Sequence, residues 1–253
     1  MSTSDHVSPL CDLLLEAHRS GVPVSVAPEL EPASSDLAYA IQREVLAQRK
    51  LSVGGWKVGA KSPQGKAQYA SLPSNCVMPE PAYLPLSKNS RTGLELEIAF
   101  AFSRSFPPQP EGYSSQEVFA GLSTMSAAIE VVASRIAGWP DCGKLSQLAD
   151  MQNHGALVVG ATIAYDENFA FFDPVADMRM EDEILFSGTG NNPAGDPRWL
   201  LPWIINYRCA QNQPVKAGEI ITTGSYVGMH FPQKTCTITA QLGSLPPVRL
   251  MLI

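Results

Sequence analysis

Two glutamates stand two positions apart in an otherwise apolar, strand-forming stretch, Glu95–Phe102, which reads ELEIAFAF. Side chains two apart on a strand point to the same face, so Glu95 and Glu97 project together. Adjacent carboxylates repel each other, and removing them from water is costly unless a partner compensates. A divalent cation that prefers oxygen ligands is such a partner. The pattern predicts a metal site, with Glu130 of a second apolar run as third ligand; a solvent-exposed strand face is the alternative.

Further polar positions suit the binding of a charged substrate. Lys57 lies in the strand-like run GWKVG, and a lysine beside a metal can neutralise a carboxylate or transfer a proton. A surface lysine is the alternative. Asp150 follows a short apolar run and can hold a lysine or a metal-bound water, or simply cap a helix. The stretch 220–225 leads from a strand into a glycine turn, where a hydroxyl and backbone N–H groups can bind a carboxylate.

Composition narrows the class of partner. Only 17% of the 253 residues are charged, against about 25% in typical proteins. This shortage favours self-association, so we expect a homo-oligomer. The formal net charge of −6 and the lack of Lys/Arg runs argue against a nucleic-acid partner.

The sequence also gives expectations about location. Residues 1–6 have neither a basic start nor an apolar core, which is unlike a signal peptide. No apolar stretch reaches the roughly 20 residues of a membrane helix. The five cysteines are far apart and form no CxxC pair, so neither a disulfide framework nor a zinc site is expected. We therefore predict a cytoplasmic protein without a membrane partner.

Hydrophobic spacing predicts an α+β fold. Helices are expected over 7–20, 36–50, 116–127 and 197–207. Strands are expected over 56–58, 94–102, 129–134, 156–164, 219–223 and 235–242. This order places a small helical N-terminal subdomain at 1–53 and a mainly β body at 54–253. Phosphate-loop, HExxH and GxSxG motifs are absent from the sequence.

Taken together and in order, several segments resemble the fumarylacetoacetate hydrolase superfamily, in its 2-keto-4-pentenoate hydratase and 4-oxalocrotonate decarboxylase branch. They are Gly55–Gly59 with Ser62, Glu95–Phe100, Ala128–Val132 with Ser134–Ile136, Leu148–Asp150 and Thr223–Ser225. The resemblance implies a mixed β-roll as the catalytic domain, 54–253. It also implies a Mg²⁺ or Mn²⁺ ion on Glu95, Glu97 and Glu130, and small-molecule 2-oxo acid substrates.

The activity implied by this resemblance is that of a metal-dependent lyase. It would hydrate 2-hydroxypenta-2,4-dienoate to 4-hydroxy-2-oxopentanoate through a metal-stabilised enolate. Lys57 would bind the substrate carboxylate and transfer a proton, with Ser62 and Ser225 as further substrate contacts. Asp150 and His154 would complete the catalytic set. A complex with a homologous decarboxylase or an aldolase is a further expectation.

Four positions depart from the pattern of this branch. Ala133 stands where an aspartate is usual, and Met151 where an asparagine usually follows Ala-Asp. Glu80 is the only acid in the proline-rich stretch 75–83, and His154 replaces a small residue. His154 or Glu80 could serve as a replacement base; for His154, a plain hydrogen-bonded histidine is the alternative.

These departures keep two alternatives to the hydratase open. In one, the same fold and metal catalyse decarboxylation of a 2-oxo-3-enedioate, tautomerisation or C–C hydrolysis. In the other, the chain is non-catalytic, and binds a 2-oxo acid or serves as the structural partner of an active homologue.

Overall fold

Two helices precede the sheets in the computed structural model, which describes residues 8–253. Helix α1 (Pro9–Ser20) begins after Ser8, whose side chain accepts a hydrogen bond from the N–H of Leu10. Helix α2 (Ser35–Gln48) begins after Ser34, which caps it in the same way. Both predicted N-terminal helices are therefore present; Val7, the predicted first residue of α1, lies outside the described residues.

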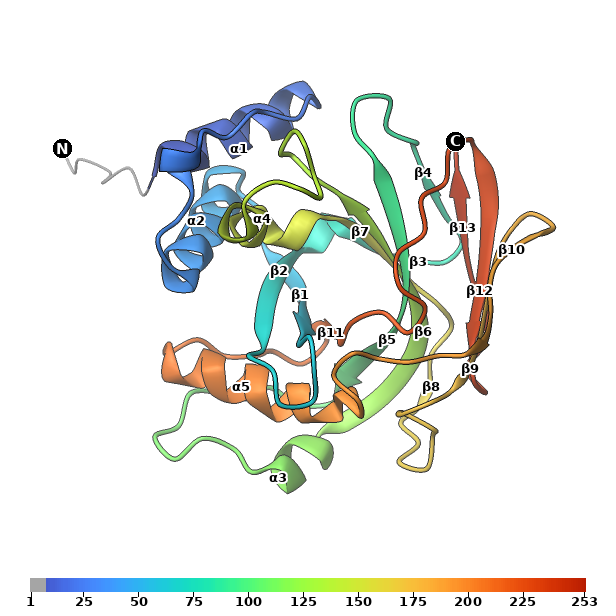
Figure 1. Ribbon diagram of the computed structural model, residues 1–253. Coiled ribbons are helices and arrows are strands. Elements are labelled where there is room, and N and C mark those ends of the chain that lie inside the picture. The colour runs from blue at the N-terminus through green and yellow to red at the C-terminus, as the bar shows by residue number, and fades with distance from the viewer. Residues whose placement is uncertain (1–7) are drawn as a thin grey trace.

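The first sheet carries the site and has eight strands, in the order β2-β1-β11-β5-β6-β7-β3, with β8 paired to β6 (Figure 1). Its strands are β1 (Val53–Gly59), β2 (Gln68–Pro73), β3 (Val77–Pro79), β5 (Thr92–Phe102), β6 (Leu122–Ala133), β7 (His154–Val159), β8 (Ile163–Ala164) and β11 (Ile220–Thr222). The β1/β11 and β3/β7 pairs are parallel and the others antiparallel. The sheet is therefore mixed, as predicted.

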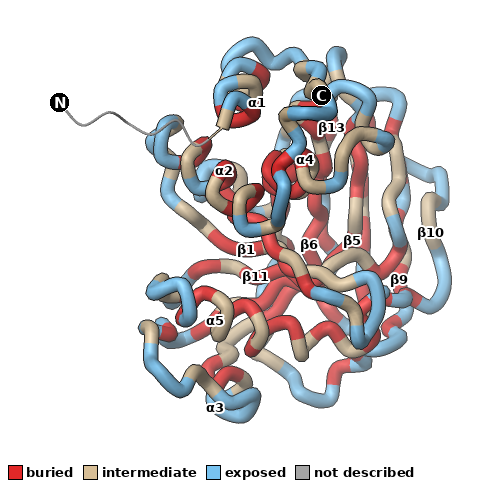
Figure 2. The backbone as a smooth tube through the Cα atoms, turned by 60° about the vertical axis from the view of Figure 1, so that its left-hand side comes forward, coloured by how far each residue is buried: buried red, intermediate tan, exposed pale blue. Residues whose placement is uncertain are grey.

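The second sheet has five strands in the order β10-β9-β12-β13-β4 and packs against β5, β6 and β7. Its strands are β4 (Ala82–Leu84), β9 (Val175–Met180), β10 (Glu183–Thr189), β12 (Cys236–Leu242) and β13 (Val248–Leu252). Leu96, Ile98 and Phe100 of β5 belong to the same buried cluster as Ile238 and Leu250 of this sheet. Figure 2 shows β5 and β6 as largely buried strands.

The opposite face of β5 and β6 carries the glutamates beside small apolar residues. A separate buried cluster is formed by Leu72, Ala99, Ala128 and Leu157. Ala99 is two positions from Glu97, and Ala128 is two positions from Glu130. Strand alternation therefore places these two alanines on the same face of the sheet as the two glutamates. Methyl side chains at these two alanines leave space next to the carboxylates.

The predicted helix over 116–127 is wrong for most of its length. Helix α3 spans only Ser115–Phe119, opened by a capping box in which Ser114 and Glu117 bond each other's backbone N–H groups. Strand β6 already begins at Leu122 and pairs with β5 from there onward. Long-range pairing with β5 thus overrides the helical spacing of this segment.

Helix α4 packs against α2, and helix α5 packs against α3 and β1. Helix α4 spans Lys144–Ala149, and α5 spans Leu200–Ala210 after the 3₁₀ turn η4 (Pro197–Trp199), close to the predicted 197–207. Further 3₁₀ turns are η1 (Pro28–Leu30), η2 (Ser74–Cys76) and η3 (Met151–Asn153). None of the helices within 8–253 combines the length and apolar character needed to cross a membrane.

The fold class is confirmed: a helical start followed by curled mixed sheets. The division into 1–53 and 54–253 stays a prediction. Helix α2 is in fact tied to the β body, because the Gln42 side chain donates to the Leu148 carbonyl and accepts from the Ser71 N–H. All five cysteines are free, in agreement with the sequence analysis.

We expect His18 of α1 to make the fold sensitive to acid. Burial, followed by the charges of Arg135 and Arg49, lowers the pKa of His18 from 6.5 to about 3. Its Nε2 lies 3.4 Å from Nη1 of Arg49, a contact that suits the neutral ring. A depressed pKa contributes stability above pH 6.5 that is lost as the pH falls towards 3.

Replacing His18 with Gln should remove this contribution. The drop in unfolding free energy between pH 7 and pH 4.5, measured by urea denaturation, should be about 2 kcal/mol smaller in His18→Gln than in the wild type. Equal drops in the two proteins would contradict this assignment.

Candidate metal centre and active site

Strand register brings the three glutamates together. Glu95 lies directly opposite Glu130 in the antiparallel β5/β6 pair, and Glu97 follows two positions later on the same face. One carboxylate oxygen from each lies within 4.8 Å of the others. Glu97 and Glu130 are each only 1% exposed. Like charges opposite each other destabilise a sheet, so this arrangement requires positive charge nearby.

The crowding changes the acidity of two of the carboxyls. Burial, followed by the charge of Glu130, raises the pKa of Glu95 to about 7. Burial and the charges of Glu130 and Glu95 raise the pKa of Glu97 to about 8. In the absence of a cation, these two groups therefore bind protons more tightly than ordinary glutamates do.

One carboxylate oxygen of Glu130 contacts both the Lys57 ammonium and the His154 ring. Its Oε1 lies 2.5 Å from the Lys57 ammonium and 3.0 Å from Nδ1 of His154. Burial alone would raise the pKa of Glu130, but the charge of Lys57 and the hydrogen bond from His154 outweigh it and hold this pKa below its usual value. Glu130 is thus the ionised member of the cluster.

The remaining oxygen of Glu130 tests whether the site fits a metal. Its Oε2 is buried and has no hydrogen-bond partner. A buried, unpaired carboxylate oxygen is costly, and this one belongs to a set of three carboxylates within ligand range of one another. An all-oxygen donor set suits a hard divalent cation such as Mg²⁺ or Mn²⁺ and not zinc, which favours nitrogen and sulfur. The residues present therefore fit the predicted ion.

Lys57 reaches the cluster from β1. It pairs with Thr222 of β11, which in turn pairs with Ala99 of β5, so all three residues share one row of the sheet. Burial would lower the pKa of Lys57, but Glu130 and the other two carboxylates outweigh it and raise this pKa. Lys57 is consequently an ammonium group that can donate a proton or bind an anion.

His154 supplies a neutral imidazole. Burial lowers its pKa, and a carboxylate oxygen can only accept, so Nδ1 is the donor to Glu130. The other ring nitrogen, Nε2, is buried without a partner. It is therefore an open proton acceptor, consistent with either of the two roles considered for His154.

Asp150 holds a strained turn and makes no contact with Lys57. Its carboxylate accepts from Nε of Arg135 at 2.5 Å and from the Arg135 N–H at 2.9 Å. Arg135 also donates to the His154 carbonyl at 2.5 Å. Between them, Met151–Asn153 all have positive φ values of 51–60°, which are unfavourable for residues other than glycine. Asp150 thus acts through the turn, not on a lysine.

The other predicted substrate contacts are differently placed. Ser62 is exposed in the turn between β1 and β2. The Ser225 hydroxyl donates to the Gly228 carbonyl, while the N–H of Gly224 donates to Glu97 at 3.0 Å. The glycine turn thus supports a predicted metal ligand. Glu80 lies outside the glutamate cluster, and its carboxylate accepts from the Arg249 N–H.

Sequence reasoning missed two groups at the site. The Gln152 carbonyl lies 3.4 Å from the Lys57 ammonium, and no side-chain pattern reveals a backbone acceptor. The pairing of Arg135 with Asp150 left only part of a signal: an aspartate in an apolar run needs a cation, but Lys144 is nearer to Asp150 in the sequence than Arg135 is.

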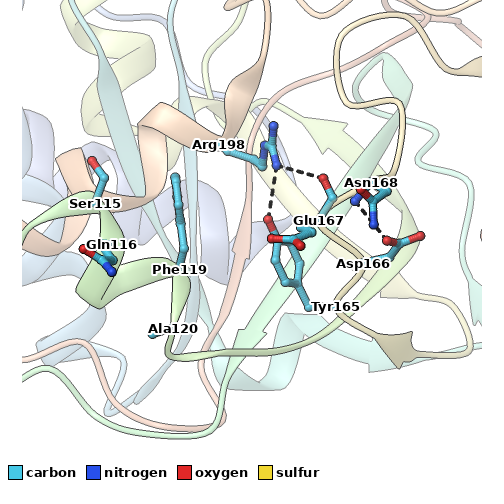
Figure 3. A pocket seen from close by; sticks show the side chains of 9 residues that line it. All are labelled: Ser115, Gln116, Phe119, Ala120, Tyr165, Asp166, Glu167, Asn168 and Arg198. Carbon is cyan, nitrogen blue, oxygen red and sulfur yellow. Dashed lines mark hydrogen bonds between the residues drawn. The ribbon is translucent and has the colours of Figure 1, made fainter.

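A separate cavity of about 830 Å³ lies between α3 and the segment 165–168 (Figure 3). Its only cation, Arg198, is already bound by Asp196, by the Tyr165 hydroxyl and by the Glu167 carbonyl. None of the three clustered glutamates lines it. The candidate chemistry is therefore centred on the glutamate cluster and not on this cavity.

Similar proteins are found among curated sequences and among solved structures. No protein-family model matches the chain. A 2-keto-4-pentenoate hydratase from Paraburkholderia phymatum is 25% identical over 260 residues, covering 98% of each chain. A 2-keto-4-pentenoate hydratase 3 from Pseudomonas putida is 27% identical over 224 residues, covering 84% of this chain and 82% of the relative.

Solved structures share the fold. A 4-oxalocrotonate decarboxylase from Pseudomonas putida G7, complexed with magnesium and adipate, has a TM-score of 0.84 at 19% identity, covering 100% of this chain and 99% of the other. A fumarylpyruvate hydrolase from Pseudomonas aeruginosa, in complex with Mn²⁺ and pyruvate, has a TM-score of 0.55 at 12% identity, covering 78% and 88%.

The mixed sheets give the chain the fold of a 4-oxalocrotonate decarboxylase and, less closely, of a fumarylpyruvate hydrolase. In sequence, the chain is similar over 98% and 84% of its length to two proteins named for 2-keto-4-pentenoate hydratases.

Replacing Glu130 should abolish tight metal binding. In Glu130→Gln the amide keeps the shape but loses the charge, and calorimetry should show Mn²⁺ affinity reduced by more than the roughly 10–100-fold that loss of an outer-sphere partner costs. Glu183→Gln, at an exposed position on β10, is the matched control and should bind as the wild type does. Unchanged affinity in Glu130→Gln would exclude Glu130 as a ligand.

The effect of metal on stability should depend on pH. Because the folded pKa values of Glu95 and Glu97 are raised, their protonated forms stabilise the metal-free fold at low pH, and this contribution is lost as the pH rises through about 7 and 8. A cation must displace these protons. The rise in melting temperature on adding Mg²⁺ should therefore be larger at pH 8.5 than at pH 6; an equal rise would show that these carboxyls are not ligands.

Proposed function

We propose that the protein is a metal-dependent carbon–oxygen lyase that hydrates 2-hydroxypenta-2,4-dienoate to 4-hydroxy-2-oxopentanoate. The observation that carries this proposal is the buried cluster of Glu95, Glu97 and Glu130, with Lys57 and His154 both on one oxygen of Glu130. The two relatives described above are named for a hydratase of this kind.

The proposed cofactor is Mg²⁺ or Mn²⁺, held by the three glutamates. When bound, the ion supplies the positive charge that a 2-oxo acid needs to develop negative charge on its keto oxygen. The residues favour such an ion because all three donors are carboxylates and one oxygen of Glu130 has no other partner.

The chain itself supplies the proton transfers in this proposal. Lys57, kept as an ammonium by the carboxylates, binds the substrate carboxylate and donates a proton. His154, neutral and with Nε2 free, takes a proton from the water or from the substrate hydroxyl. Arg135 and Asp150 position both groups, because their ion pair holds the turn that contains Gln152 and leads into His154.

Decarboxylation of a 2-oxo-3-enedioate is the second candidate. This reaction needs the same stabilisation of negative charge on the keto oxygen, but no attacking water. It therefore does not require the acid that the branch usually has at position 133, where this chain has alanine. The structural neighbour with the higher TM-score is a decarboxylase, which supports this candidate through the fold alone.

Several broader expectations belong to the same proposal. We propose a homo-oligomer located in the cytoplasm, acting in the breakdown of aromatic compounds, with a homologous decarboxylase or an aldolase as complex partner. The low charge content supports self-association, and the names of the relatives support the place in catabolism.

Turnover of 2-hydroxypenta-2,4-dienoate tests the proposal. Metal-stripped protein should be inactive, and restoring Mg²⁺ or Mn²⁺ should cause loss of the diene absorbance with 4-hydroxy-2-oxopentanoate as product. Ketonisation without hydration would point to a tautomerase, and release of CO₂ from a 2-oxo-3-enedioate would point to the second candidate. Metal binding without turnover of either substrate would favour a non-catalytic role.

Replacing Lys57 with Met should separate catalysis from metal binding. We expect kcat to fall by about 10²–10⁴-fold, the usual contribution of a positioned proton donor. Mn²⁺ binding should persist, because the three carboxylates remain. Lys216→Met, a lysine outside the site, serves as the control. Near-full turnover by Lys57→Met would remove Lys57 from the mechanism.

A further inference from the structure

The peptide group between Thr223 and Gly224 is held from both sides. Its N–H, that of Gly224, donates to Oε2 of Glu97 at 3.0 Å. Its carbonyl, that of Thr223, accepts from the side-chain amide of Asn192 at 3.0 Å. Because the C=O and N–H of a trans peptide point in opposite directions, the two bonds fix the orientation of one plane. Asn192 therefore acts on Glu97 through a single peptide group.

The side chain of Asn192 is itself fixed. It is only 2% exposed, and its Nδ2 donates a second hydrogen bond, at 2.9 Å, to the Gly224 carbonyl. Its Oδ1 accepts from the Ala194 N–H at 2.9 Å. An amide group has two N–H donors on one side and an acceptor on the other, so turning it over would lose all three bonds.

Backbone hydrogen bonds join the same segments but leave this peptide group free to turn. The Asn191 N–H donates to the Tyr226 carbonyl at 2.9 Å, and the Tyr226 N–H donates to the Leu96 carbonyl of β5 at 2.9 Å. These bonds hold the glycine turn against β5 through Tyr226. They do not involve the peptide between Thr223 and Gly224, so its orientation depends on Asn192.

Glycine at position 224 makes the opposite orientation accessible. Rotating the peptide group changes mainly ψ of Thr223 and φ of Gly224. Gly224 has a φ of 92°, and glycine adopts positive and negative φ about equally well. The rotated peptide would direct the Thr223 carbonyl at the Glu97 carboxylate, where two acceptors would face each other. A donor on the Thr223 carbonyl is therefore needed to select the observed orientation.

We propose that Asn192 is a positioning residue for the metal centre. By holding the N–H of Gly224 towards Glu97, it keeps this carboxylate directed at Glu95 and Glu130 and so sets the affinity for the divalent cation. The inference rests on the cofactor of the proposed function and not on the reaction catalysed. Partners of this kind, which orient a ligand without touching the metal, typically contribute about 10–100-fold to metal affinity.

Mn²⁺ calorimetry on the full-length protein tests this role without depending on turnover. Asn192→Asp keeps the size of the side chain and the acceptor for the Ala194 N–H, but it cannot donate to the two carbonyls. It should bind Mn²⁺ about 10–100-fold more weakly than the wild type. Asn192→Ala removes the donors without adding a buried charge. It should weaken binding in the same direction, and it replaces Asn192→Asp if that variant does not fold.

Asn206 of α5 offers a matched control. Its Nδ2 donates to the Tyr113 carbonyl at 2.8 Å, and its Oδ1 accepts from the Tyr113 N–H at 2.7 Å. This amide therefore also bonds a backbone segment, but one that precedes α3 and contains none of the three glutamates. Asn206→Asp and Asn206→Ala should lower the melting temperature of the metal-free protein and leave its Mn²⁺ affinity at the wild-type value.

Hydrogen exchange of the Gly224 amide, followed by NMR, tests the same orientation in the metal-free wild type, without any variant. The bond to Glu97 should protect this amide, and Asn192→Ala should remove the protection.

Four outcomes would overturn the inference: wild-type Mn²⁺ affinity in the Asn192 variants, equal losses of affinity in the Asn192 and Asn206 variants, an unprotected Gly224 amide in the wild type, or no binding of Mn²⁺ by the wild type. The proposed function fails separately, if Mn²⁺ binds and depends on Asn192 as expected but the loaded protein does not hydrate the dienoate.

Discussion

The structure depends on the repulsion among three carboxylates held within 4.8 Å of one another in a largely buried site. Lys57 and His154 compensate part of this repulsion, but both contact the same oxygen of Glu130. Glu95 and Glu97 are left with raised pKa values, and the second oxygen of Glu130 is left without a partner. The carboxylates thus lack enough compensating positive charge, and this shortage is the physical basis for the proposed metal-dependent lyase.

The surrounding strands and turns hold the carboxylates and Lys57 in this arrangement. The pairing of β5 with β6 fixes Glu95 opposite Glu130, and small residues on the same face, such as Ala99 and Ala128, leave room beside the carboxylates. The parallel pairing of β1 with β11 places Lys57 in the same row of the sheet as Thr222 and Ala99. The strained turn before β7 would relax on its own; the many hydrogen bonds that Arg135 makes across it keep it in place.

The sequence was sufficient to predict the parts of the fold that follow from local spacing. Alternation in ELEIAF predicted the strand and the shared face of Glu95 and Glu97, and the ordered motifs predicted the mixed β-roll. The short edge strands, such as β3 and β4, escaped prediction because three residues carry no period. The helix expected over 116–127 failed because pairing across the sheet overrode local propensity.

The site was predicted less completely than the fold. The three glutamates and Lys57 could be named from residue type, whereas the partner of Asp150 and the contact from the Gln152 carbonyl depend on a turn with three successive positive φ values. Such a turn arises from tertiary hydrogen bonds and leaves no local pattern.

The most direct test of this account is a crystal structure of the protein soaked with Mn²⁺ and an unreactive 2-oxo acid, using anomalous diffraction to locate the metal. The account predicts one strong manganese peak in contact with carboxylate oxygens of Glu95, Glu97 and Glu130, with the carboxylate and keto oxygens of the acid completing its ligands. A manganese site elsewhere, or a 2-oxo acid bound away from Lys57, would contradict it.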